Sequence, residues 1–163
     1  MATPTLIEIA GASDANSYVS LAEAVAYHES RLFNDAWVNA GNPEKIKALI
    51  WATRVLDRVR FKGFPATSSQ ALRWPRIDVE NIDGELLDSE SIPTQIANAT
   101  CELALLLLTS DRTVETGTEG FEEIRVGPIS LKMASSDRIK PISNEINSLL
   151  VGLTQTGLEV SRG

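Results

Sequence analysis

The chain has 163 residues, of which 43% are hydrophobic, and it carries a formal net charge of −7. This length suits one domain with a sizeable core, and the acidic balance argues against a generally basic nucleic-acid binder while leaving room for a local basic patch. The single cysteine excludes an intramolecular disulfide, and the longest apolar run, Leu103 to Leu108, is far shorter than the roughly 20 residues of a membrane span.

The first part of the chain predicts one short strand and two helical segments. Residues 6–10 alternate weakly between apolar and polar side chains, which indicates a strand. Ser20 and Glu23 form a Ser-x-x-Glu capping box, after which apolar residues recur at helical spacing. A further helical turn that carries Trp37 is expected over residues 34–40. The start carries no charged and apolar signal-peptide pattern, so we expect a soluble, cytoplasmic protein.

The next helix has clear start and stop signals. Asn42 is a suitable N-cap, and Pro43 suits the first helical position. Gly63 and Pro65 predict that the helix stops near Arg60. Its predicted core face consists of Ile46, Leu49, Ile50, Thr53 and Leu56.

A second face of this helix is basic. At about 100° per residue, four side chains fall together on it: Lys47, Trp51, Arg54 and Arg58. Cations that contact phosphates, with an indole that stacks on a base, would make this face a platform for single-stranded nucleic acid. One aromatic residue and an acidic net charge weigh against that interpretation.

The segment from Gln70 to Arg76 is the most unusual in the chain. Pro75 disfavours the helical conformation at Trp74, so the segment must be extended or turned. We expect Trp74 to pack against the preceding helix as a structural anchor. Arg73 and Arg76 flank it and are candidates for a subunit interface.

The charge of the chain changes sign around this segment. Residues 54–76 hold six basic side chains against one acid, whereas residues 78–90 hold six acids and no base. These charges could form a solvated surface with internal Arg–carboxylate pairs, or a head-to-tail interface between subunits in a ring. The interface candidates are Arg54, Arg58, Arg60, Lys62, Arg73, Arg76, Asp78, Glu80, Asp83 and Glu85.

The remaining elements are a buried helix, two hairpins and a last helix. Asp83-Gly84 predicts a small hairpin turn. Residues 94–109 predict a helix that is apolar on most sides and therefore central. Residues 122–133 alternate around Gly127-Pro128 as in a β-hairpin, and Pro141 is expected to start the last helix.

These elements predict a mainly α fold. It is a small bundle of three to four helices with a β-hairpin and short strands, and with an extended C-terminal tail. We expect one domain over residues 1–150, with the hairpin near residues 122–133, and a tail over residues 151–163.

The sequence offers little for catalysis. His28 lies on an apolar helix face, and Cys101 lies in the buried helix without an activating base nearby. One histidine and one cysteine cannot build a thiolate–imidazole zinc site within a chain. The acids of residues 78–90 could hold a hard cation but lack the EF-hand spacing. No nucleotide-binding or nucleophile-elbow motif is present, so we expect no enzyme activity, no cofactor and no metal.

An ordered set of short motifs matches a known family. In chain order they are Ala-Asn-Ser-Tyr-Val-Ser at 15–20, Ala-Glu-Ala at 22–24, Trp37, Ala-Thr-Arg-x-Leu-Asp at 52–57, Phe-Lys-Gly at 61–63, Ser-x-Gln-Ala-Leu-x-Trp-Pro-Arg at 68–76, an acidic Asp-Gly turn, Ile-Pro at 92–93, Ala-x-x-Glu-Leu-Ala at 99–104 and Val-Gly-Pro-Ile-Ser at 126–130. The chain therefore resembles the tailed-phage family labelled DnaT-like single-stranded-DNA-binding protein, whose members resemble head–tail connector adaptors.

This resemblance implies a structural virion protein. It implies a homo-oligomeric ring of twelve copies beneath the portal protein, around the genomic double-stranded DNA, joined to a stopper or tail-terminator protein. The expected location is the head–tail interface of the virion, with the host cytoplasm during assembly and no membrane. We favour the adaptor over the family's label because a channel that lets DNA slide needs few phosphate-neutralising contacts. The expected portal or neck contacts lie in the tail: Leu153, Leu158, Val160 and Arg162.

Two other functions remain open at this point. One is a single-stranded-DNA-binding module that uses the basic helix face defined above. The other is a small cytoplasmic regulator with no nucleic-acid or virion role.

Overall fold

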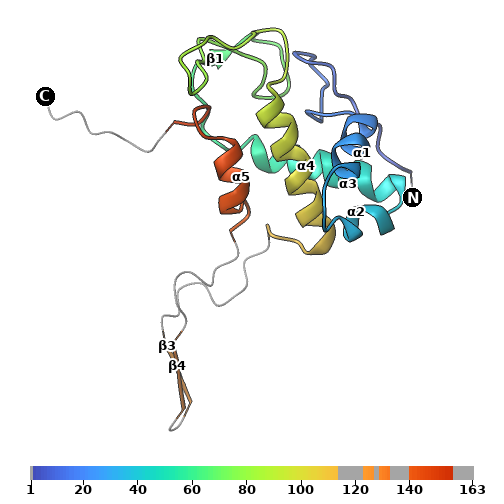
Figure 1. The fold of residues 1–163 in the computed structure, drawn as a ribbon, viewed down its shortest axis with the longest axis vertical. Helices are drawn as coiled ribbons and strands as arrows, with labels where there is room; N and C mark the ends of the chain where they lie inside the picture. The colour runs from blue at the N-terminus through green and yellow to red at the C-terminus, as the bar shows by residue number, and fades with distance from the viewer. Residues whose placement is uncertain (1, 114–122, 127–128, 133–139, 156–163) are drawn as a thin grey trace, which may run out of the picture.

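The computed structural model describes residues 2–113, 123–126, 129–132 and 140–155 (Figure 1). These residues form a mainly helical small domain, which confirms the predicted fold class. The elements in chain order are α1 (Leu21–Glu29), α2 (Asp35–Asn39), α3 (Asn42–Leu56), β1 (Phe64–Pro65), β2 (Arg76–Ile77), α4 (Thr94–Thr109), β3 (Glu123–Val126), β4 (Ile129–Lys132) and α5 (Asn144–Leu149).

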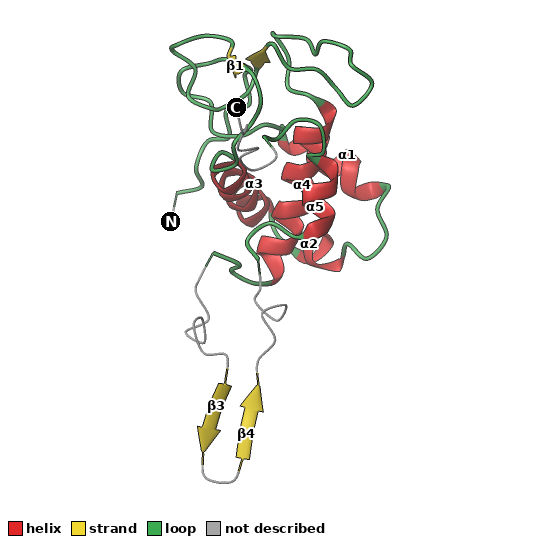
Figure 2. Ribbon diagram, turned by 90° about the vertical axis from the view of Figure 1, so that its left-hand side faces the viewer, coloured by secondary structure: helices red, strands yellow, loops and turns green. Residues whose placement is uncertain are grey.

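Helix α4 is the centre of the core, as its apolar composition predicts. It packs against α3 along much of its length and also contacts α1, α2 and α5 (Figure 2). Ile96 and Leu103 on α4 are fully buried, as are Leu49 and Leu56 on α3. A helix that is apolar on most sides is stable only when neighbours cover most of them, and this arrangement supplies those neighbours.

The helix starts follow the local sequence signals closely. The side chain of Ser20 accepts a hydrogen bond from the Glu23 amide, and the Glu23 carboxylate accepts one from the Ser20 amide, so the predicted capping box is present. Helix α3 starts one residue earlier than predicted, because Gly41 takes the cap position and Asn42 becomes the first helical residue.

The end of α3 differs from the prediction. The helix stops at Leu56 instead of near Arg60. Asp57 caps it, and the chain then turns, with the Arg58 amide bonded to the carbonyl of Val55 at 3.2 Å. Arg58 therefore follows the helix rather than extending its basic face.

The two predicted hairpins are present and the predicted first strand is not. Strands β3 and β4 pair antiparallel with Glu123 opposite Lys132. The predicted Gly127-Pro128 centre of this hairpin lies outside the described residues. An isolated antiparallel bridge joins Glu80 to Leu86 around the Asp83-Gly84 turn. Residues 6–10 form no strand because the Ile7 amide is bonded to the Asn16 side chain at 2.8 Å rather than to a neighbouring strand.

The last described residues pack onto the domain. Helix α5 begins after Ser143, which caps it, and not directly at Pro141. Leu153 is 1% exposed, and its carbonyl accepts a hydrogen bond from the Lys62 amide at 2.9 Å. Leu153, expected as a portal contact in a free tail, is thus a core residue. The other three tail contacts, Leu158, Val160 and Arg162, lie outside the described residues.

Candidate nucleic-acid interface

One face of α3 presents a tryptophan to solvent. Trp51 is 36% exposed, whereas the other two tryptophans, Trp37 and Trp74, are 3% and 1% exposed. The helical period that buries Leu49 and Leu56 on the opposite side of α3 is what turns Trp51 outward. An accessible indole is the group that can stack on an unpaired base.

Cationic side chains lie beside this indole. The guanidinium carbon of Arg54 is 5.8 Å from the centroid of the Trp51 ring, within the range of a cation–π contact. Lys47 lies one turn before Trp51 on the same exposed face. The structure therefore brings together three of the four residues of the predicted basic face, and it leaves Arg58 exposed in the turn that follows.

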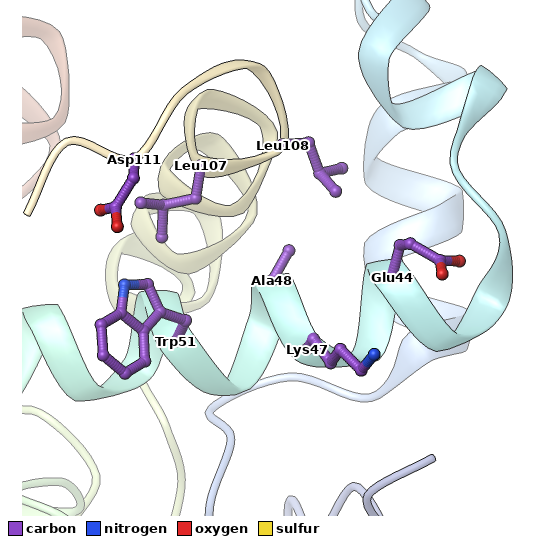
Figure 3. A pocket seen from close by; sticks show the side chains of 7 residues that line it. All are labelled: Glu44, Lys47, Ala48, Trp51, Leu107, Leu108 and Asp111. Carbon is purple, nitrogen blue, oxygen red and sulfur yellow. The ribbon is translucent and has the colours of Figure 1, made fainter. Parts of the chain in front are cut away.

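A hollow of about 310 Å³ opens next to Trp51, between α3 and the C-terminal end of α4. Its lining residues are Glu44, Lys47, Ala48, Trp51, Leu107, Leu108 and Asp111. Figure 3 shows Trp51 and Asp111 at one end of the hollow, with Lys47 and Glu44 at the other. Its surface is mainly apolar, since Ala48 and the two leucines form its inner part. The sequence did not predict this hollow, because it needs two helices that are far apart in the chain.

Asp111 is held in place at the rim of the hollow. Its Oδ1 atom accepts a hydrogen bond from the Thr113 amide at 2.9 Å and another from the Thr113 hydroxyl at 2.6 Å. These bonds lower the pKa of Asp111, so the carboxylate is ionised at neutral pH. Both bonds use the same oxygen, which leaves Oδ2 free of hydrogen bonds from the described residues.

The Trp74 segment lies in the core instead of on a binding surface. Trp74 meets Phe61 edge to face, with ring centroids 5.5 Å apart, and the Trp74–Pro75 peptide bond is cis. The side-chain amide of Gln70 donates to the carbonyls of Leu72 and Pro75, which closes the loop upon itself. Trp74 is therefore placed where a structural anchor would be.

The two arginines that flank Trp74 differ in their surroundings. Arg76 is 5% exposed and donates hydrogen bonds to the backbone carbonyls of Lys62, Gly63 and Arg73 at 2.6, 2.7 and 3.1 Å. Burial lowers its pKa from the usual arginine range. The guanidinium of Arg76 thus binds carbonyls of its own chain, and Arg76 is no longer a candidate for a subunit interface.

Arg73, by contrast, is exposed. Its Nε donates to the carbonyl of Asp57 at 3.1 Å, and its amide donates to the Asp57 carboxylate at 3.3 Å. The Tyr18 hydroxyl donates to the same carboxylate. Burial raises the pKa of Asp57, although these donors oppose that effect. The Arg73 guanidinium keeps its outer nitrogens toward solvent.

The other predicted interface residues lie in the loops around the small β1–β2 sheet. Lys62, Asp78 and Glu80 line a second, polar hollow of about 320 Å³, while Asp83 and Glu85 are exposed on the turn beyond it. Arg60 is exposed in the turn after α3. Within the described ranges no salt bridge joins the basic segment to the acidic one, and no group of three or more His, Cys, Asp or Glu residues could hold a metal ion.

An ion pair that sequence reasoning missed joins Arg31, just after the end of α1, to Glu102 on α4. Arg31 Nε is 2.7 Å from Glu102 Oε1, and the Tyr27 hydroxyl donates to the same oxygen at 2.8 Å. Glu102 stands in a stretch of leucines, and a lone acid in such a stretch is the signal that could have indicated a buried partner.

The two side chains most often used in catalysis are both buried. The His28 ring lies 4.3 Å from the Trp37 ring, and burial lowers its pKa. Cys101 lies inside α4, where burial raises the pKa of its thiol to about 12. In the described part of the chain, no helix is long and apolar enough to cross a membrane.

These features define a small helical domain with an exposed tryptophan between cations, beside an apolar hollow. Cations beside an exposed aromatic ring are typical of surfaces that bind single-stranded nucleic acid. The model of one protein family, described as "Putative DnaT-like ssDNA binding protein", matches residues 6–163. The chain belongs to this family. No match was found among curated proteins or among solved structures.

This match corrects the function that we favoured from the sequence. The expected head–tail connector that joins portal to stopper is wrong, since the family that matches nearly the whole chain is described as binding single-stranded DNA. The match does not test the location of the protein or the number of copies that assemble, and both stay predictions. The error came from giving the acidic net charge more weight than the local basic face of α3.

Proposed function

We propose that this protein binds single-stranded DNA through the exposed face of α3, with Trp51 stacking on a base and Lys47 and Arg54 contacting phosphates. The observation that carries the proposal is the 36% exposure of Trp51 together with the Arg54 guanidinium 5.8 Å from its ring. The family description supports the same ligand. Stacking accepts any base, so this surface binds with little sequence preference from stacking alone.

The net charge of −7 lowers the affinity of the protein for DNA, which is also negatively charged. Long-range repulsion from the acidic residues opposes approach, so affinity has to come from short-range contacts at the α3 face. Each phosphate that a cation neutralises on a single strand contributes about −0.7 to the slope of log K against log salt. The two cations Lys47 and Arg54 therefore predict a slope of about −1.4.

The proposal also assigns the protein a binding role and no enzymatic one. His28 and Cys101 are buried away from the α3 face, and the groups on that face are an indole, a primary amine and guanidinium groups. These groups supply charge and stacking.

Tryptophan fluorescence offers a direct test, because Trp51 is the accessible one of the three tryptophans. A single-stranded oligonucleotide of about 16 nucleotides, the upper end of a typical site, is titrated into the protein at low salt. We expect quenching of the fluorescence of Trp51. The titration is repeated at rising salt to obtain the slope.

Matched variants then separate stacking from charge, with a labelled oligonucleotide and fluorescence anisotropy as the readout. Trp51→Ala should cost about 1–3 kcal/mol, and Trp51→Phe should recover most of it. Arg54→Gln should reduce the salt slope by about 0.7. Lys62→Gln removes the same charge among acidic neighbours and should leave the slope unchanged. An absence of binding at low salt, or full affinity in Trp51→Ala, would overturn the proposal.

A further inference from the structure

We propose that the hollow beside Trp51 receives one unpaired base of the bound strand, and that Asp111 makes it prefer cytosine over thymine. This inference rests on the proposed binding of single-stranded DNA and adds the class of base that the site selects. The site comprises Trp51 and Ala48 from α3, Leu107 and Leu108 from α4, and Asp111 just after α4.

The lining of the hollow suits a base better than any other part of a nucleotide. Its inner surface is apolar and adjoins the indole of Trp51 (Figure 3). At the Trp51 end the carboxylate of Asp111 repels a phosphate, and at the other end Glu44 offsets the charge of Lys47, so the apolar space between them suits an uncharged base. Lys47 and Arg54 lie on the outer face of α3, where the phosphates on either side of that base would find cations.

Asp111 provides the selectivity. Thr113 occupies Oδ1 with two hydrogen bonds, so the carboxylate is fixed in orientation and its Oδ2 can only accept a further bond. Cytosine carries an amino group at the position where thymine carries a carbonyl oxygen. An ionised carboxylate accepts a hydrogen bond from that amino group and repels the thymine oxygen. The two bases have the same ring size, so stacking on Trp51 does not distinguish them.

The experiment compares oligo(dC) with oligo(dT) of equal length, by anisotropy at slightly alkaline pH where cytosine is uncharged. The wild type should bind oligo(dC) roughly threefold to tenfold more tightly, the effect of one net hydrogen bond. Asp111→Asn should remove this preference, because an amide can donate to the thymine oxygen as readily as it accepts from the cytosine amine. Asp83→Asn, which removes an acid on the distant exposed turn, should keep the preference.

The possible results separate this inference from the function on which it rests. Equal affinity for both oligonucleotides, with both weakened in Trp51→Ala, would overturn the base preference and leave single-strand binding intact. A preference that persists in Asp111→Asn would overturn the role of Asp111. Failure of both oligonucleotides to bind would overturn the proposed function as well.

Discussion

Arg76 should be required for the stability of the fold. The substitution Arg76→Gln removes the guanidinium that satisfies three backbone carbonyls, those of Lys62, Gly63 and Arg73, with bonds of 2.6 to 3.1 Å. A glutamine amide can reach at most one of them. A buried carbonyl that loses its donor typically costs about 1–3 kcal/mol, because the group left behind stays desolvated. We expect a loss of that size in the free energy of unfolding.

Urea denaturation followed by circular dichroism measures this loss, and Arg73→Gln is the matched control. Arg73 is exposed, and its side chain makes one hydrogen bond, of 3.1 Å, to the Asp57 carbonyl, so its replacement should cost about 1 kcal/mol or less. Arg76→Lys keeps the charge but not the planar fork and should fall between the two. A cost below about 1 kcal/mol for Arg76→Gln would refute the reasoning.

Two further predictions concern buried side chains. Trp74→Ala should lower the free energy of unfolding by about 3–5 kcal/mol, because the indole is 1% exposed and packs on Phe61; unfolding in urea checks this, and a change near zero would show that the segment is not an anchor. The thiol of Cys101 should resist alkylation in the folded protein, since it is 2% exposed and burial raises its pKa to about 12, so that little of the reactive thiolate is present at neutral pH. In urea the rate of alkylation should rise steeply near the ordinary thiol pKa of about 8.5. Fast alkylation of the folded protein below this pH would show that Cys101 is not buried.

The elements that could be predicted are those whose signals are local. The capping box of Ser20 and the apolar stretch of α4 act over a few residues, and both appear in the structure where the sequence indicates them. The end of α3 was predicted too late because the local stop signals, Gly63 and Pro65, come several residues after Asp57, where the chain turns to meet Tyr18 and Arg73. Those partners are distant in sequence, so no local pattern could show them.

The same distinction applies to the candidate site. The basic face with Lys47, Trp51 and Arg54 follows from the helical period alone. The hollow could not be predicted, since Leu107 comes from a helix that begins nearly forty residues after α3 ends. Nor could the sequence separate Arg73 from Arg76, because both flank Trp74 and only the position of the Lys62–Gly63 backbone decides which one is buried.

The acidic charge of the chain is compatible with single-strand binding because the charges are unevenly placed. The six acids of residues 78–90 lie in the loops near β1, at one end of the domain, whereas Lys47 lies near the start of α3 (Figure 1). A single strand of DNA that approaches these loops is repelled by their carboxylates, whereas one that approaches the α3 face meets cations and an indole. The acidic residues 78–90 therefore confine bound DNA to the short exposed face of α3. It follows that binding should be weak per site and only modestly dependent on salt, because few phosphates are contacted, and that Trp51 should contribute more to affinity than any single cation.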